Sequence, residues 1–366
     1  MIDRTQRYYE YLLRELYLRS YLKPYPINRG YRMPAEWERH AATWLTWPHN
    51  VDTWPDMLAS VEKEMVSIVM ALSETEVVRV NVLNKAHEDH VSRLLHKRVA
   101  TGTIIFHQLA TNDSWCRDCG AIFLTSSNQE HPLLSLNFKY NAWGGKYPPY
   151  NLDQGVAEFM ARTLLIPEFL SKMYLEGGAV DVNGAGTLIT TLECLLKRNP
   201  EMSQIEIEQE LKNTFGVKKV IWLGKGLEGD DTDGHIDQLA RFVSQNRVVI
   251  SSEENTKDYN YLPLIKSQEI LANAKLADGT GIEIVELPMP DPIYYQNSRL
   301  PASYANFYIA NELVIMPAFG CPQDAIAREI LSECFMDRNV ISVDCRSILV
   351  GLGAVHCLTQ QVPSIG

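Results

Sequence analysis

Short runs rich in β-branched and aromatic residues alternate with longer runs of helical periodicity along most of the chain. Apolar residues at every second position predict strands, whereas apolar residues three and four positions apart predict helices. The predicted strands are Val77–Leu83, Thr103–Leu109, Ala121–Thr125, Leu133–Phe138, Thr187–Thr191, Lys219–Leu223, Arg247–Ser251, Ile282–Leu287, Tyr304–Ile309, Glu312–Met316 and Val340–Asp344. The predicted helices are Trp54–Leu72, Asp153–Leu165, Ser203–Phe215, Asp258–Ala274 and Gln323–Cys334.

This alternation continues without a low-complexity linker or a change of composition. Strands that alternate with helices are typical of an α/β fold. A single domain over residues 31–366, built from repeated strand–helix modules, is therefore favoured over two separate domains.

Residues 1–30 are predicted to form an N-terminal helical extension. Tyr8, Leu12 and Leu16 recur at helical spacing and form one apolar face. The segment lacks the apolar run of a secretory signal, and its acidic residues, Glu10 among them, are atypical of a transit peptide. Such a helix packs either on its own domain or on a partner chain.

Composition and charge narrow the class of protein. Of 366 residues, 46% are hydrophobic and 22% charged, as in globular proteins with a sizeable core. The net charge of −11 disfavours a nucleic-acid partner, and no apolar stretch is long enough to cross a membrane. Seven scattered cysteines, an odd number, are typical of a reducing compartment, so we expect a cytoplasmic protein.

Three signatures resemble known sites but lack the context that those sites need. Gly224–Gly229 reads GxGxxG, but the acidic residues that follow, beginning with Asp230, would repel a pyrophosphate. Cys116–Cys119 is a lone CxxC without the second pair of a four-cysteine zinc site. His87–His90 places its histidines three apart, unlike HExxH, and is typical of a solvated helix face. We expect neither a dinucleotide nor a metal at these segments.

Four other polar clusters are harder to explain as scaffold. They are Asn112–Gly120 with Asp118, Leu175–Gly178 with Glu176, Gly234–Asp237 with His235 and Asp237, and Val355–Cys357 with Cys357. Each alone has a structural explanation as a turn acid, a hydrogen-bonded histidine or a small buried thiol. Their leading residues, however, are separated by 58, 59 and 122 positions. Five modules of similar length, each contributing a loop to a common centre, would give this spacing, with the vacant position near Asn297 and Arg299.

The chemistry of this set favours a cationic, planar substrate. A thiolate is a strong nucleophile, and a histidine within reach can move protons for it. Three carboxylates beside the thiol would raise its pKa, whereas a bound guanidinium would pair with them and offset their charge. Attack of the thiolate on the guanidinium carbon would expel ammonia, and water would then release a urea.

At these residues the chain resembles the agmatine deiminases of the guanidine-modifying, or pentein, superfamily. The resemblance runs from Tyr31 to Pro363. Its motifs are Met33–Glu38, Asn112–Gly120, Asn141–Gly145, Leu175–Gly178, Thr232–Asp237, Leu300–Tyr304 and His356–Gln361. It implies an α/β propeller of five ββαβ-type modules around a pseudo-fivefold axis, no metal or organic cofactor, and a homodimer or higher homo-oligomer.

Carried over by motif, the resemblance implies a role for each site residue. Cys357 would be the nucleophile and His235 the general acid and base. The guanidinium would be held by the carboxylates of Glu176, Asp118 and Asp237. Trp115 and Trp143 would line the pocket, although core packing is the alternative for both. The implied reaction is hydrolysis of agmatine to N-carbamoylputrescine and ammonia through a covalent thiouronium on the cysteine.

Two alternatives remain beside this function: a deiminase of free or peptidyl arginine, and a catalytically silent scaffold that binds a partner. The first would need a basic residue, such as Arg117 or Arg299, to meet a substrate carboxylate. The chain also departs from the family pattern. The usual G-G-G-N-I-H-C run reads G-L-G-A-V-H-C at Gly351–Cys357, and Asp233 adds a carboxylate that we expect to raise the pKa of His235.

Overall fold

The computed structural model describes residues 24–96, 102–127 and 130–365. Most of the predicted N-terminal extension therefore lies outside the described residues. Its described end forms a 3₁₀ turn, η2 (Pro26–Arg29), which ends at Gly30 in the left-handed conformation with φ 74°. Among the described residues, none of the helices combines the length and apolar character that crossing a membrane requires.

Four three-stranded sheets share one pattern. In each, an antiparallel pair of strands is followed by a parallel pair whose connection carries one or more helices. The strands are β4 (Ile122–Thr125), β5 (Leu133–Lys139) and β6 (Glu168–Tyr174); β7 (Val180–Val182), β8 (Thr187–Thr191) and β9 (Lys219–Leu223); β10 (Ala240–Phe242), β11 (Arg247–Ser252) and β12 (Glu283–Pro288); and β15 (Tyr308–Ile309), β16 (Leu313–Ala318) and β17 (Asn339–Asp344). The main connecting helices are α7 (Val156–Leu164), α8 (Leu192–Arg198), α9 (Gln204–Phe215), α10 (Tyr261–Asn273) and α11 (Gln323–Cys334).

A fifth sheet joins the two ends of the described chain. The C-terminal strand β18 (Thr359–Pro363) pairs antiparallel with β1 (His40–Thr46). The strands β2 (Val77–Val82) and β3 (Ile104–Gln108) continue this sheet in parallel, with helices α2 (Leu58–Leu72) and α3 (Lys85–Leu94) in the connections. The sheet fixes the position of the cysteine-bearing segment directly before β18.

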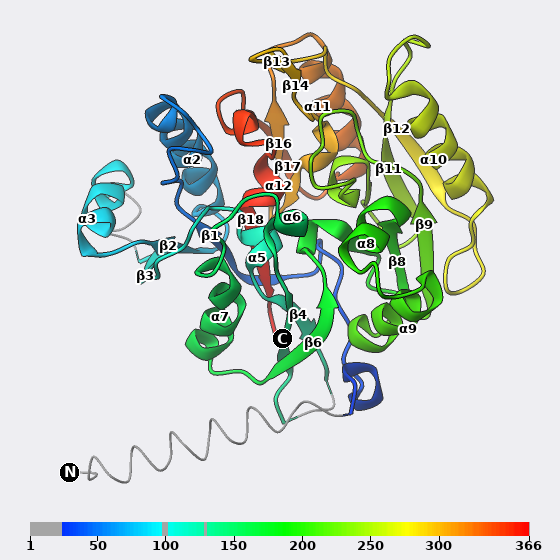
Figure 1. Ribbon diagram of the computed structural model, residues 1–366, viewed down its shortest axis with the longest axis horizontal. Helices are drawn as coiled ribbons and strands as arrows, with labels where there is room; N and C mark the ends of the chain where they lie inside the picture. Colours follow the sequence, from blue (N-terminus) through cyan, green and yellow to red (C-terminus); the bar gives the residue numbers. More distant parts are fainter. Residues whose placement is uncertain (1–23, 97–101, 128–129, 366) are drawn as a thin grey trace.

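In every one of these five sheets, a short helical turn directly precedes the outer strand of the antiparallel pair, which is β18 in the fifth sheet. The turns are α5 (Cys116–Cys119), η4 (Gly177–Ala179), η5 (Ile236–Gln238), η6 (Tyr304–Asn306) and α12 (Val355–Leu358). Each turn contacts the next along the chain, and α12 contacts α5. Figure 1 shows α5 and α12 near the centre of the view, with the longer helices farther out. The turns therefore form a closed ring of contacts.

Helix α9 illustrates how local sequence sets the ends of an element. The Ser203 hydroxyl accepts a hydrogen bond from the Glu206 amide, and the Glu206 carboxylate accepts one from the Ser203 amide at 2.8 Å. At the other end Gly216 has φ 68°, and a Cβ there would lie 2.3 Å from the carbonyl oxygen of Tyr31. Only glycine combines this backbone conformation with so close an approach.

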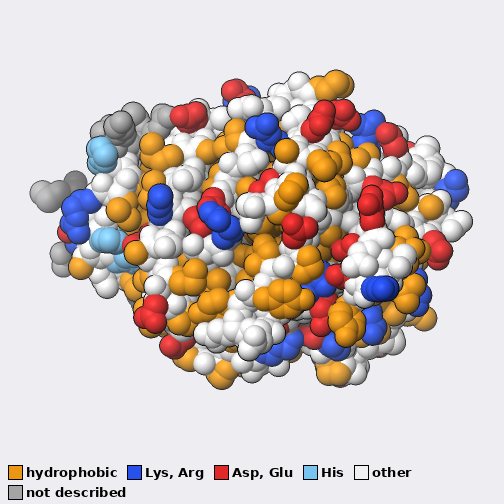
Figure 2. Space-filling model, turned by 90° about the horizontal axis from the view of Figure 1, so that it is seen from above, with side chains coloured by type: hydrophobic (Ala, Val, Ile, Leu, Met, Phe, Trp, Pro, Cys, Tyr) orange, Lys and Arg blue, Asp and Glu red, His pale blue; other side chains and the backbone are white. Residues whose placement is uncertain are grey.

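The core lies between the sheets and their helices. All five residues of β8 are buried, as expected for the central strand of a partly parallel sheet. Large aromatic side chains, including Trp44, Trp54 and Phe307, are fully buried. On the outside, Figure 2 shows acidic, basic and apolar side chains intermingled on one face, without a continuous basic area over it.

Most predicted strands and helices are confirmed, and the differences have local causes. Tyr304–Asn306 was predicted as strand but is the 3₁₀ turn η6, because the Ser303 hydroxyl accepts a hydrogen bond from the Ala305 amide and starts a turn. The predicted helix Trp54–Leu72 begins only at Leu58, after a series of turns.

The strands that the sequence pattern missed include β1, β6, β7, β10 and β18. Strands β7 and β10 have three residues each and β18 is polar. Strand β1 is buried on both faces, and in β6 Leu170 is exposed while Ser171 is buried, so neither gives a clear period-two signal.

Candidate active site

Four of the seven predicted site residues line a pocket of about 620 Å³, and the other three are buried next to them. The lining residues are Trp115, Asp118, Trp143 and Cys357. The buried ones are Glu176, His235 and Asp237, which are 0–1% exposed. The fold therefore brings all seven together from segments far apart in the sequence.

The cysteine thiol lies between an amide and a carboxylate. The Asn306 side-chain amide donates to Cys357 Sγ at 3.1 Å, and the thiol lies 3.6 Å from Asp237 Oδ2. Oδ1 of the same Asn306 side chain accepts hydrogen bonds from the backbone amides of His356 and Cys357, at 3.1 and 3.3 Å. Burial, and then the charges of Asp237 and Asp118, hold the pKa of the Cys357 thiol well above its usual range, which confirms the expected direction.

The glycines before the cysteine leave room for an indole. A Cβ on Gly353 would lie 2.5 Å from the Trp115 ring and 3.0 Å from Cys357 Cβ, and one on Gly351 would lie 2.8 Å from the same ring. Between them Leu352 takes the left-handed conformation with φ 70°. The altered run therefore keeps glycine at both positions where Trp115 packs against the backbone.

Asp118 is held from two sides. The Trp143 indole donates to its Oδ2 at 3.0 Å, and the Gly178 amide donates to its Oδ1 at 3.1 Å. Burial raises the pKa of Asp118 to about 6, with a contribution from Asp237, although His235 opposes the shift. Trp143 is thus both a pocket wall and a hydrogen-bond donor to a site carboxylate.

The turn that carries Trp143 has a strained backbone. Ala142 and Trp143 have φ values of 49° and 57°, in the left-handed region that non-glycine residues rarely adopt. The Asn141 side chain accepts from the Gly144 amide at 2.9 Å and supports the turn. Strain of this kind is often kept where it aims a functional side chain.

His235 lies between two carboxylates. Its Nε2 is 3.4 Å from Glu176 Oε2, and its Nδ1 is 3.7 Å from Asp118 Oδ1. Burial opposes protonation, but the charge of Asp118 and contacts with Cys194 and Glu176 hold the pKa of His235 well above its usual range. These contacts therefore favour the protonated imidazole, which can act as an acid.

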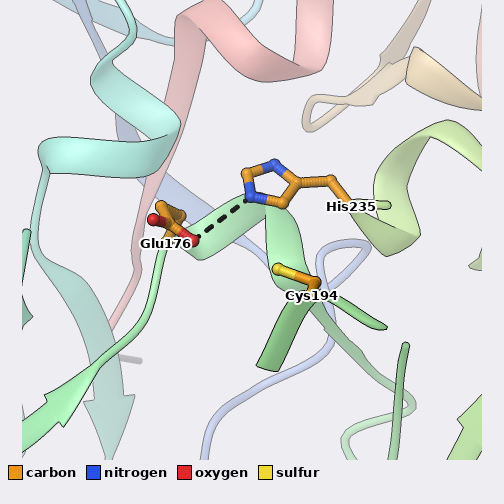
Figure 3. A group of neighbouring side chains, drawn as sticks. All are labelled: Glu176, Cys194 and His235. Atoms are coloured by element: carbon orange, nitrogen blue, oxygen red, sulfur yellow. Dashed lines mark hydrogen bonds and ion pairs between the residues drawn. The ribbon is translucent and has the colours of Figure 1, made fainter. Parts of the chain in front are cut away.

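Glu176, Cys194 and His235 form a group whose ligand atoms lie within 4.8 Å of one another (Figure 3). A carboxylate, a thiol and an imidazole are the ligand types of a zinc site. However, the Arg198 guanidinium already donates to Glu176 Oε1 at 2.7 Å. A second cation would lie beside this guanidinium, so the group does not fit a metal ion.

Both glycines of the Gly177–Gly178 pair are closely approached by other parts of the chain, and a Cβ on Gly177 would lie 2.3 Å from the Arg117 carbonyl oxygen. A Cβ on Gly178 would lie 2.6 Å from His235 Nδ1, 2.9 Å from Asp118 Oδ1 and 3.0 Å from Asp237 Oδ2. Three of the predicted site side chains therefore converge on the face of one glycine.

Two atoms of this convergent group have no hydrogen-bond partner. Among the described residues, His235 Nδ1 and Asp237 Oδ1 are buried polar atoms without one. Buried polar groups in native structures are normally paired, and an orphan at a site suggests a ligand that would supply the partner.

Five further residues of the site were not assigned roles from the sequence. They are Glu36, Cys194, Arg198, Asn306 and His356. Glu36 and His356 lie inside motifs that carried the family resemblance, and Asn306 lies just after one. Cys194 and Arg198 lie in α8, and no local pattern distinguishes them from ordinary helix residues.

Two sequence expectations are wrong. The vacant fifth position is not filled by Asn297 and Arg299 themselves, although the adjacent Tyr295 and Gln296 line the pocket. Arg299 pairs with Asp258 at 2.8 Å, and Asn306, from the fifth turn of the ring, contacts the thiol. Asn297 lies in the turn of the β13 (Tyr294–Tyr295) and β14 (Ser298–Arg299) hairpin.

The expected effect of Asp233 on His235 is also wrong. Asp233 pairs with Arg198 at 2.6 Å, Lys146 at 2.9 Å and Lys197 at 3.0 Å. Despite partial burial, these partners lower its own pKa to about 2. Its charge is therefore neutralised locally.

The outer part of the pocket is acidic. Its lining includes Asp52, Asp113, Asp153 and Asp231, against one lysine, Lys146. Lys146 is itself paired with Asp233 and donates to the carbonyl oxygen of Asp231. The pocket as a whole therefore favours a cation.

Comparison with known proteins agrees with this geometry. The model of the Porphyromonas-type peptidyl-arginine deiminase family matches residues 32–363. The chain belongs to this family. The resemblance to agmatine deiminases is also confirmed: an agmatine deiminase of Medicago truncatula is 35% identical, over 94% of this chain and 100% of that one.

Solved structures of agmatine deiminases are similar to this family member over nearly the whole chain. The agmatine deiminase of Enterococcus faecalis has a TM-score of 0.87 at 29% identity, covering 94% of this chain and 98% of that one. A cysteine-to-serine variant of the C. jejuni agmatine deiminase, solved with substrate bound, has a TM-score of 0.82 at 32% identity, covering 91% and 96%. The α/β fold of this chain is therefore that of the agmatine deiminases.

Proposed function

We propose that this protein hydrolyses agmatine to N-carbamoylputrescine and ammonia through a covalent intermediate on Cys357. The observation that carries the proposal is the convergence of carboxylates, an imidazole and a thiol around Gly178, beside an acidic pocket. A guanidinium supplies N–H groups for the carboxylates and a positive charge that offsets theirs.

Binding of the substrate would prepare the nucleophile. Asp118, Glu176 and Asp237 accept hydrogen bonds from the guanidinium, and Trp115 and Trp143 form the walls beside it. The pKa of the thiol is raised by burial and nearby carboxylates, so the cation lowers it again and favours the thiolate. The thiolate then attacks the guanidinium carbon, and a C–S bond forms.

His235 would serve as acid and then as base. The imidazolium donates its proton to one amino group, the C–N bond breaks, and ammonia leaves a thiouronium on Cys357. Neutral His235 then takes a proton from water as the water oxygen bonds to the same carbon. The C–S bond breaks with return of the thiolate, and the hydroxyl proton passes through solvent to the released ammonia, which leaves the neutral urea, an ammonium ion and a protonated His235.

A deiminase of free or peptidyl arginine is less well supported. Arg299 pairs with Asp258, and Arg117 donates to Gln361 Oε1 at 2.8 Å. Lys146 is also paired, so the described pocket lining offers no free cation to a substrate carboxylate. A silent scaffold is disfavoured because the thiol, the imidazole and all three carboxylates are present.

We infer that the five sheets are the five modules of an α/β propeller about a pseudo-fivefold axis, and that residues 31–366 act as one catalytic domain. The ring of contacts among the five turns supports this arrangement. All seven cysteines are free thiols, which suits a reducing cytoplasm. The predicted homodimer or higher homo-oligomer would be tested by light scattering.

The deciding experiment is mass spectrometry of agmatine incubated with the purified protein, beside a Cys357→Ala control. We expect a gain of about 1 Da, with release of ammonia, because a C–N bond is replaced by a C–O bond after attack by the thiol. The control should show neither. Arginine and a peptidyl-arginine substrate would be tested in parallel, and faster turnover of either would replace agmatine as the substrate.

A further inference from the structure

Five buried ionisable side chains form a connected series that begins beside the thiol, with Asp237 3.6 Å from Cys357 Sγ. The series consists of Asp237, His356, Glu36, Arg241 and Asp181, which are 0–7% exposed. Adjacent members contact one another: His356 lies 2.7 Å from Asp237 and 2.8 Å from Glu36, and Arg241 lies 2.9 Å from Glu36 and 3.3 Å from Asp181. The proposed reaction uses Asp237 and gives no role to the other four side chains of the series.

His356 contacts a carboxylate with each ring nitrogen. Nδ1 faces Asp237 Oδ2 and Nε2 faces Glu36 Oε2, both at hydrogen-bond distance. A neutral imidazole has one N–H group, and an ionised carboxylate only accepts hydrogen bonds. Both contacts can be hydrogen bonds at the same time only if both nitrogens carry a proton.

The two carboxylates are ionised in the folded protein. Burial opposes this, but Arg241, His356 and Arg117 hold the pKa of Glu36 well below its usual range. Burial opposes ionisation of Asp237 too, and hydrogen bonding and charge from His356 lower its pKa. Each nitrogen of His356 thus faces a negative charge.

The contact with His356 determines how Asp237 meets the site. It occupies Oδ2, the oxygen that also lies 3.6 Å from Cys357 Sγ, while Oδ1 has no hydrogen-bond partner among the described residues. A positive charge on His356 therefore offsets the carboxylate charge nearest the thiol. The contact between His356 and Oδ2 also holds Asp237 in place, so that its Oδ1 can accept a hydrogen bond from a guanidinium N–H.

The backbone of the cysteine turn does not depend on this imidazole. Side-chain Oδ1 of Asn306 accepts hydrogen bonds from the backbone amides of His356 and Cys357. The Thr359 hydroxyl donates to the backbone carbonyl of Val355 at 3.0 Å. Loss of the His356 ring would therefore disturb Asp237 before it displaced the thiol.

We propose that His356 is a positioning residue, an imidazolium held between Glu36 and Asp237 that orients Asp237 toward the substrate and offsets its charge beside Cys357. The proposal deepens the proposed function and rests on it for the identity of the substrate. The charge state of His356 is independent of that identity.

The first test is ¹⁵N NMR of the protein labelled at histidine, with the His356 signals identified by their loss in His356→Gln. We expect both ring nitrogens to show the signature of protonation, because each lies at hydrogen-bond distance from a carboxylate oxygen. A neutral tautomer, with one protonated nitrogen, would overturn the proposal whatever the substrate is.

The second test is turnover of agmatine by His356→Gln, compared with His40→Gln. The glutamine amide carries no positive charge to offset that of Asp237, so kcat should fall about 10- to 100-fold, as it does when residues that orient metal ligands are replaced. His40 is also buried, with Nδ1 3.5 Å from Glu76 and Nε2 2.7 Å from the backbone carbonyl oxygen of Glu36, but it contacts neither Asp237 nor the Glu36 carboxylate. Its variant should lose thermal stability and keep kcat.

The double variant Glu36→Gln with His356→Gln tests the effect of the charge itself, while the NMR test on the parent protein does not depend on how the variants turn over agmatine. It removes one positive and one negative charge together, so kcat should rise above that of His356→Gln. Turnover by folded His356→Gln within twofold of the parent would contradict the proposal, and so would a double variant with no gain. Absence of agmatine turnover in the parent would instead contradict the proposed function.

Discussion

At the scale of single residues, the site depends on how burial and charge shift proton affinities. His235 is driven toward its protonated form by Asp118, whereas the Cys357 thiol is driven away from ionisation by burial and by the same group of carboxylates. Two groups with such opposed tendencies are suited to act as an acid and as a nucleophile that ionises only on demand. The substrate cation shifts the thiol toward its ionised form, because it offsets the charge of the nearby carboxylates.

The dependence of the thiol pKa on a bound cation predicts that a guanidinium ligand changes the pH dependence of Cys357 alkylation. Without ligand, the rate of inactivation by iodoacetamide should rise with an apparent pKa above about 8.5, the reference value for cysteine. Guanidinium ion at millimolar concentration, far below denaturing levels, should lower that pKa, because it offsets the charges of Asp118 and Asp237. An apparent pKa already below about 6.5 without ligand would contradict this prediction.

At the scale of elements, the five short turns bring the chemical groups into contact. Each is only three or four residues long and makes few hydrogen bonds of its own. Their geometry comes from neighbouring turns and from glycines that permit close approach. The η4 turn is the strongest case, because Gly178 faces three side chains of the site.

Gly178→Ala should therefore reduce activity far more than stability would explain. The new methyl would lie 2.6 Å from His235 Nδ1 and would displace Asp118 or Asp237 from the guanidinium. We expect kcat/KM for agmatine to fall by more than about 100-fold, since displacements of about 1 Å at a site cost this much. Gly155→Ala is the matched control, because a Cβ there meets nothing within 4 Å and φ is not positive. Equal losses in both variants would show that close approach at Gly178 is not the cause.

At the scale of the whole molecule, the acidic pocket affects folding as well as binding. Asp153, at the pocket wall, accepts from the backbone amides of Asn112 and Asp113 at 2.7 and 3.3 Å, and within the described part of the chain it forms no ion pair with a cation. Burial raises its pKa from 3.8 to about 7, and Asp113 adds to the shift. A carboxyl that is harder to ionise when folded favours the folded state at low pH and loses that advantage as pH rises.

Asp153→Asn should therefore change the pH dependence of unfolding. The parent should lose stability relative to the variant as pH rises from about 4 to about 7, the window between the unfolded and folded pKa values of Asp153. The asparagine oxygen can still accept from the two amides. At pH 8 the free energy of unfolding of the variant should exceed that of the parent by roughly 1–3 kcal/mol, with no difference at pH 4. Denaturant unfolding at both pH values would measure this, and a constant difference would contradict it.

The sequence alone determined the elements whose signals are local. Periodicity gave five of the helices and most strands of five or six residues, because burial of one face imposes a repeat on the residues that form it. The motifs around Asp118, Glu176, His235, Asp237 and Cys357 indicated the chemical groups.

Only the tertiary structure decided which groups meet. Asn306, Arg198 and Cys194 have no distinctive local pattern, and their contacts with the site depend on pairing between distant segments. The same holds for Asp233, whose sequence position suggests an effect on His235 but whose charge is neutralised by Arg198 and two lysines. Periodicity reports which face of an element is buried, whereas proton affinities depend on distances across the ring of five turns, and those distances exist only once the sheets have assembled.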